Sequence, residues 1–140
     1  MRARHVALNP TLWIFAEGPS SHDEQAAARI AWQNAVTRRA ADLGIPIVAG
    51  TDGLLEPRGG LPTLHDELVQ EVTGAGLTPM QALVSATSNA AKAIGVDRER
   101  GSIEPGKLAD IVLLSANPLD DIRNSRAIRY VIEGGRVVTR

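Results

Sequence analysis

A short apolar run followed by Gly-Thr-Asp-Gly constrains the fold of this chain more than any other feature. The run covers residues 47–49 and lies between Pro46 and Gly50, which is typical of a strand covered on both faces in a parallel sheet. Asp52 would then stand just beyond the carboxyl end of that strand. In alternating α/β proteins this end of the sheet carries the functional site. The pattern therefore predicts an α/β fold with the Asp52 carboxylate at its rim.

The first hundred residues alternate between predicted strands and predicted helices. A strand is expected at residues 6–8 and a loop at residues 10–21. Ser21 and Glu24 have capping-box spacing, and residues 78–81 (Thr-Pro-Met-Gln) form a second capping box with proline at the first helical position. The helices predicted from apolar spacing cover residues 22–43, 63–75 and about 79–94. Strand, helix, strand and helix in this order predict parallel βαβ packing.

The last forty residues have the pattern of a small β segment. Strands are expected at residues 110–114, 128–133 and 136–139, with a short helical turn near residues 119–122. Gly-Gly at residues 134–135 is a strong signal for a two-residue hairpin. This segment therefore predicts an antiparallel addition to the α/β part.

The composition limits the possible partners. A net charge of -1 over 140 residues gives no electrostatic reason to expect nucleic acid or an anionic membrane as a partner. The chain has no cysteine, which excludes disulfides and thiolate-bound zinc and fits a cytoplasmic location. No apolar run approaches the roughly 18 residues that a membrane span requires.

Six sequence blocks together resemble the C-terminal part of an amidohydrolase, a metal-dependent hydrolase. The resemblance covers roughly residues 5–140 and is closest to the imidazolonepropionase-like and Xaa-Pro-dipeptidase-like branch. The blocks are residues 49–52 (Ala-Gly-Thr-Asp), 64–68 (Leu-His-Asp-Glu-Leu), 76–83 (Gly-Leu-Thr-Pro-Met-Gln-Ala-Leu), 86–91 (Ala-Thr-Ser-Asn-Ala-Ala), 101–110 (Gly-Ser-Ile-Glu-Pro-Gly-Lys-Leu-Ala-Asp) and 131–138 (Val-Ile-Glu-Gly-Gly-Arg-Val-Val).

The resemblance implies a fold and a role for Asp52. Residues 1–100 would form the last strands and helices of a TIM (β/α)₈ barrel, with the seventh strand at 6–8 and the eighth at 47–49. Residues 101–140 would supply the C-terminal strands of a β-sandwich domain. Asp52 would be both a metal ligand and the catalytic base toward the attacking water. A divalent cation, most often zinc, lowers the pKa of bound water from about 15.7 to about 7.

Several features of the family have no counterpart here. The His-x-His pair, the carboxylated lysine or glutamate, two further histidines and the N-terminal sandwich strands are all missing from this sequence. A metal of this class needs three to five protein ligands, so Asp52 alone cannot hold one tightly. The chain is therefore expected to be the C-terminal portion of an enzyme that hydrolyses a carbon–nitrogen bond in a non-standard peptide or cyclic amide, and to be inactive alone.

Two further residues are candidates for the substrate pocket. His65 could line the mouth of the pocket or be a surface or capping residue, and Trp13 could contact the substrate or pack under its loop. His5 and His22 are interpreted as structural. The expected partners are a small-molecule substrate and either further copies of the chain or a missing N-terminal portion. The rival interpretation is a non-catalytic domain that oligomerises or docks through an open edge of the barrel.

Overall fold

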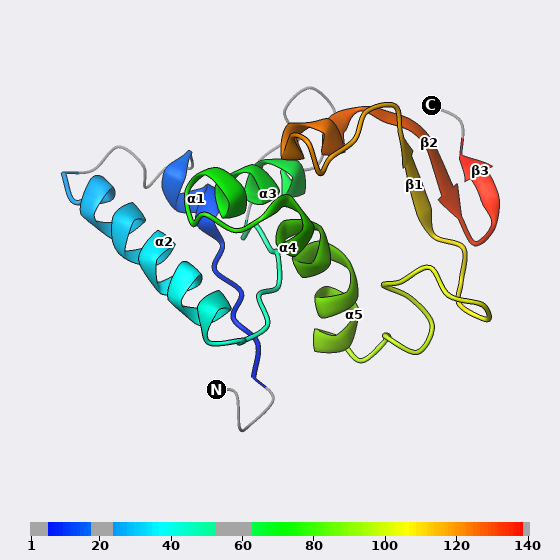
Figure 1. Cartoon of the computed structure of the whole chain (residues 1–140), viewed down its shortest axis with the longest axis horizontal. Helices are drawn as coiled ribbons and strands as arrows, with labels where there is room; N and C mark the ends of the chain where they lie inside the picture. Colours follow the sequence, from blue (N-terminus) through cyan, green and yellow to red (C-terminus); the bar gives the residue numbers. More distant parts are fainter. Residues whose placement is uncertain (1–5, 18–23, 53–62, 139–140) are drawn as a thin grey trace.

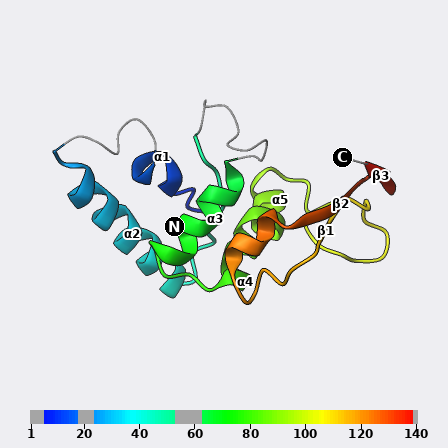
Figure 2. The same ribbon diagram turned by 90° about the horizontal axis from the view of Figure 1, so that it is seen from above.

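The computed structural model describes residues 6–17, 24–52 and 63–138, and it shows an α/β chain with a small antiparallel sheet. The helical part lies at one end of the molecule and the sheet at the other (Figures 1 and 2). Among the described residues, no helix combines the length and apolar character needed to cross a bilayer. In chain order the helices are α1 (Leu12–Ala16), α2 (Ala26–Asp42), α3 (Leu64–Thr73), α4 (Pro79–Val84), the π-helix η4 (Ser85–Asn89), α5 (Ala90–Ala93) and the 3₁₀ helix η5 (Ile122–Arg126).

The helix α1 forms where the sequence predicted a loop, so that prediction was wrong. Its N-cap residue, Thr11, has a left-handed backbone with φ 48° and makes no side-chain cap. The first two backbone N–H groups of α1 instead donate to the carboxylate of Glu67, far along the chain. A local pattern could not predict the helix, because the group that caps it is distant in sequence.

The helices α2 and α3 agree with the predicted ones apart from their ends. Gly44 stops α2 with a φ of 69°, and its N–H donates to the carbonyl of Ala41. The predicted cap at Ser21 lies outside the described residues. Trp32 on α2 is two-thirds exposed at 66%, so the apolar face expected there is only partly covered in this structure.

The predicted helix over residues 79–94 is present as α4, η4 and α5 in succession. Its capping box is complete, because the Thr78 hydroxyl accepts from the Gln81 N–H at 3.2 Å and the Gln81 side chain accepts from the Thr78 N–H at 2.8 Å. The π-turn in the middle was not predicted. Such a turn changes which backbone groups bond within the helix and is frequent at functional sites.

Three antiparallel strands form a sheet in the order β1 (Ile111–Leu114), β2 (Ile128–Glu133), β3 (Arg136–Val138). This confirms the three predicted strands to within two residues at each end. Gly134 and Gly135 have φ values of 54° and 81°, as a two-residue type I′ hairpin requires. In Figure 1 the sheet projects to the side of the helical part.

The segment after residue 100 is nevertheless tied to the helices. Ile122 of η5 is 2% exposed and packs in a core cluster with Leu68 of α3 and Ala82 of α4. The helical turn expected near residues 119–122 lies slightly later, at Ile122–Arg126. A second core cluster joins α1, α2 and the segment around Ile47.

Two glycines in the segment between α5 and β1 provide a matched test of this packing. Gly101 and Gly106 both have a φ of 89°, but a Cβ at Gly101 would lie 2.5 Å from the Ala91 Cβ, whereas a Cβ at Gly106 would meet nothing within 4 Å. Gly106→Ala is expected to cost about 1–2 kcal/mol of unfolding free energy through backbone strain alone. Gly101→Ala should cost about 1–3 kcal/mol more, because it also overpacks. Urea unfolding measures both, and equal losses would contradict the close approach at Gly101.

Candidate functional site

Two chain segments lie side by side in parallel beneath Asp52. Leu8 and Ile47 form a parallel bridge, in which the Leu8 N–H donates to the Pro46 carbonyl and the Val48 N–H donates to the Leu8 carbonyl, each at 2.9 Å. Parallel strands have their carboxyl ends at the same edge, so Asn9 and Asp52 follow their strands toward the same end of this pair. Only a bridge forms here, and both predicted strands are shorter than expected.

The second edge of this segment is closed by the α4–η4–α5 helix. The Asn89 side-chain amide donates to the Ile47 carbonyl at 2.9 Å, and the Ala49 N–H donates to the Ser85 carbonyl at 3.2 Å. The chain that leads to Asp52 is therefore bonded on both sides. Asn89 thus bridges the helix to the backbone of the segment that leads to Asp52.

Asp52 itself is exposed, and its backbone has a φ of 49°. Aspartate is among the few residues that adopt this left-handed conformation without glycine. The conformation turns the chain just after the strand, which leaves the carboxylate accessible at the rim. An exposed carboxylate in this place can accept a proton or share in binding a cation.

Asn9 is a candidate that the sequence analysis missed. Its side-chain nitrogen and oxygen lie 2.5 and 2.9 Å from the position that a Cβ would take at Gly50. Only glycine leaves room for this approach. An amide thus stands over the Gly-Thr-Asp turn, and the signal that could have found it is its place directly after the predicted strand at residues 6–8.

The two predicted pocket residues lie in different environments. His65 is half-buried, and its Nδ1 lies 3.1 Å from the Ser125 hydroxyl of η5. Asp66, the next residue on α3, forms an ion pair with Arg126 of η5. The structure therefore gives His65 a contact between α3 and η5, and its role at a substrate pocket stays a prediction.

Trp13 is fully buried. Its backbone N–H donates to Glu67 at 2.7 Å, and its indole N–H has no hydrogen-bond partner among the described residues. A ring that is covered on all sides has no face to offer a substrate. The structure favours packing over substrate contact for this residue.

The described residues do not form a metal site on their own. No group of three or more histidine, cysteine, aspartate or glutamate side chains that could hold a cation occurs in residues 6–17, 24–52 and 63–138. Zinc in proteins is held by about three or four side chains. Asp52 is therefore at most one member of a ligand set.

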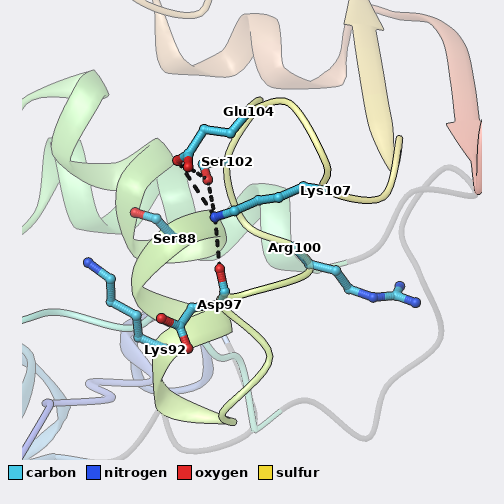
Figure 3. Close-up of a pocket in the computed structure, with 7 residues that line it drawn as sticks. All are labelled: Ser88, Lys92, Asp97, Arg100, Ser102, Glu104 and Lys107. Atoms are coloured by element: carbon cyan, nitrogen blue, oxygen red, sulfur yellow. Dashed lines mark hydrogen bonds and ion pairs between the residues drawn. The ribbon is translucent and has the colours of Figure 1, made fainter.

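A pocket of about 300 Å³ lies apart from Asp52, between α5 and the loop that leads to the sheet (Figure 3). The Lys107 ammonium sits in it and donates to the Asp97 carbonyl at 2.8 Å and to the Ser102 hydroxyl at 2.6 Å, with Glu104 at 3.6 Å. The hydrogen bond from Ser102 and the charge of Lys107 lower the pKa of Glu104. Two hydrogen bonds and one ion pair hold the ammonium, so Lys107 fastens the loop.

Comparison with known proteins supplies independent information. The sequence profile of the amidohydrolase family matches residues 10–138. The chain is 39% identical over 106 residues to the imidazolonepropionase of Geobacillus kaustophilus, covering 72% of this chain and 24% of that protein. It is 30% identical over 125 residues to the adenine deaminase of Clostridium botulinum, covering 89% of this chain and 19% of that protein.

A solved structure gives the same answer for the fold. A Xaa-Pro dipeptidase with methionine bound in its active site superposes with a TM-score of 0.82 at 29% identity, over 100% of this chain and 36% of that one. This chain thus spans roughly a fifth to a third of the length of the proteins that it resembles.

Proposed function

The chain belongs to the amidohydrolase family, and we propose that it forms the C-terminal portion of an enzyme that hydrolyses a carbon–nitrogen bond. The observation that carries the proposal is the parallel pairing of Leu8 with Ile47, which precedes an exposed Asp52. Imidazolonepropionase and Xaa-Pro dipeptidase among its relatives favour a cyclic amide or a proline-containing dipeptide as substrate. The absence of cysteine agrees with a cytoplasmic location.

We propose the same division of the fold that the sequence suggested. Residues 1–100 would be the last part of a (β/α)₈ barrel, and residues 101–140 would be strands of a sandwich domain. The parallel bridge between Leu8 and Ile47 and the separate antiparallel sheet support this division. A full barrel takes about 200 residues or more, so residues 1–100 can form only part of one. This agrees with the fact that the chain spans only a fifth to a third of the length of its relatives.

Asp52 is proposed to be the proton acceptor and one ligand of a divalent cation, most often zinc in this family. Such a cation, when bound, makes water acidic enough to attack at neutral pH. The further ligands would have to come from outside the described residues. Asp52 contributes an exposed carboxylate at the end of a segment that is hydrogen-bonded on both sides. These hydrogen bonds fix the position of the segment.

The isolated chain is expected to hydrolyse no amide, with or without added zinc, because one carboxylate cannot hold the cation. The test joins this chain to the first three quarters of the Geobacillus kaustophilus imidazolonepropionase, replacing the part that it matches. The chimera should hydrolyse the imidazolone substrate of its parent or a Xaa-Pro dipeptide. A folded, zinc-loaded chimera without activity, or an active isolated chain, would contradict the proposal.

A non-catalytic docking domain is the second candidate, and the exposed sheet favours it. Leu113 and Tyr130 pair across β1 and β2 and share one face of the sheet with Val137, and all three are 42–56% exposed. At the outer edge of the parallel pair, the backbone groups of Ala7 and Asn9 have no backbone hydrogen-bond partner among the described residues. Light scattering of the isolated chain separates the candidates, since a defined oligomer favours docking and a monomer contradicts it.

A further inference from the structure

Two carboxyl groups are fully buried one turn apart on α3. Glu67 accepts the backbone N–H groups of Leu12 and Trp13 at 2.9 and 2.7 Å. Glu71 contacts the Ser85 hydroxyl at 2.6 Å, and its second oxygen has no partner among the described residues. Buried carboxyl groups of this kind need an explanation, because burial strongly disfavours the charged form.

The hydrogen count around Ser85 fixes which group is the donor. The Ser85 hydroxyl oxygen lies 2.6 Å from Glu71 and 2.7 Å from the Ala82 carbonyl oxygen. A hydroxyl has one hydrogen, and a carbonyl can only accept. Two separate, two-centre hydrogen bonds of these short lengths require Ser85 to donate to Ala82 and Glu71 to supply a hydrogen of its own.

We propose that Glu71 carries a proton in the folded chain and donates it in a hydrogen bond to Ser85. The Ser85 carbonyl in turn accepts the N–H of Ala49 at 3.2 Å, three residues before Asp52. Glu71 is thus a positioning residue for the segment that ends at Asp52. This inference is independent of the proposed hydrolase activity.

Among the described residues, no cation packed against α3 opposes this assignment. The helices α1 and α4 carry no ionisable side chains, and η5 carries Arg123 and Arg126, which pair with Asp121 and Asp66. Arg29 of α2 lies over the Phe15 ring.

The two carboxyl groups differ in which charge state their partners favour. Burial raises the pKa of Glu71 to about 8, and the nearby charge of Glu67 adds to the rise. Burial also raises the pKa of Glu67 to about 7, while two backbone N–H groups lower it. Both oxygens of Glu67 accept N–H groups, which favours its charged form, whereas the contact of Glu71 with Ser85 favours its protonated form.

The sign of the pH dependence follows from the raised pKa. A carboxyl group whose pKa is higher in the folded than in the unfolded chain stabilises the fold fully below the unfolded value of about 4.5. That contribution is lost progressively as the pH rises through the folded value near 8. The bond between Ser85 and Ala49 should therefore open more often as the pH rises across this window.

Carbon-13 NMR of the 140-residue chain with labelled glutamate carboxyls tests the assignment. One resonance is expected to titrate near pH 8 and to vanish in Glu71→Gln, whereas Glu99→Gln at an exposed site should leave that resonance in place. Between pH 5.5 and 7.5 the hydrogen-exchange protection of the Ala49 amide should fall faster in the wild type than in Glu71→Gln, by up to about tenfold per pH unit.

Two results would overturn the inference. One is a wild-type spectrum in which every glutamate titrates below about pH 6. The other is a resonance titrating near pH 8 that persists in Glu71→Gln, as distinct from the Glu67 resonance expected nearer pH 7. If Glu71→Gln does not fold, triple-resonance assignment of the wild type identifies the Glu71 carboxyl directly, and an ordinary pKa there contradicts the proposal. If Glu71 had only a structural role, replacing it with glutamine would not remove a carboxyl resonance that titrates near pH 8.

Discussion

Replacing Asp52 with asparagine is expected to lower kcat/KM of the chimeric hydrolase by about 10³-fold or more. Asparagine keeps the shape of the side chain but cannot accept a proton at neutral pH and is a poorer ligand for a cation. Because Asp52 is exposed, the substitution should leave the unfolding free energy within about 0.5 kcal/mol of the wild type. The loss should therefore appear in turnover and in zinc content, not in folding.

Asp120→Asn is the matched control, since Asp120 is also exposed and lies in a loop near η5. This variant should keep full activity. Steady-state kinetics and metal analysis of both variants test the catalytic and metal-binding role of Asp52. An Asp52→Asn chimera that turns over within a few-fold of the wild type would remove the basis for the catalytic assignment.

Truncating Glu67 to alanine should cost about 3–5 kcal/mol of unfolding free energy. The carboxylate caps α1 through the N–H groups of Leu12 and Trp13, and Trp13 is fully buried. Its removal leaves two buried donors without an acceptor and a cavity beneath α1. Both effects act in the same direction.

Chemical unfolding followed by tryptophan fluorescence measures this loss at a pH above the Glu67 pKa of about 7, where the carboxyl is ionised. Glu99→Ala at an exposed site is the control and should change the free energy by less than about 0.5 kcal/mol. Glu67→Gln should fall between the two, because its amide keeps one acceptor oxygen. A loss for Glu67→Ala no larger than that of the control would show that α1 does not depend on this cap.

Local signals predicted the parts of the fold that local chemistry determines. Thr78 and Gln81 form the capping box that their spacing indicated, and Gly134 and Gly135 form the expected hairpin. The helix α1 was missed because its cap comes from Glu67, more than fifty residues away. No propensity within residues 12–16 reveals such a partner.

The buried acids carried a signal that could have been read from the sequence. Glu67 and Glu71 lie three and seven residues after Leu64, so helical spacing places both on the same face as Leu68 and Val72. Charged residues at positions of a core face indicate a buried polar contact. The partners, Ser85 and the α1 backbone, could not be predicted because they depend on how the helices pack.

The candidate site was predictable in part. The sequence indicated that Asp52 follows a buried parallel segment, and the bridge between Leu8 and Ile47 agrees. It did not indicate the Asn9 side chain over Gly50, which depends on the register of two segments nearly forty residues apart.

The proposed role of Asp52 requires its carboxylate to lie against a bound cation. A crystal of the zinc-loaded chimera, measured at the zinc absorption edge, locates the metal directly. The predicted result is an anomalous peak about 2.0–2.2 Å from an Asp52 carboxylate oxygen, at the carboxyl end of the pair formed by Leu8 and Ile47. A peak held entirely by other residues, with the Asp52 carboxylate directed into solvent, would contradict it.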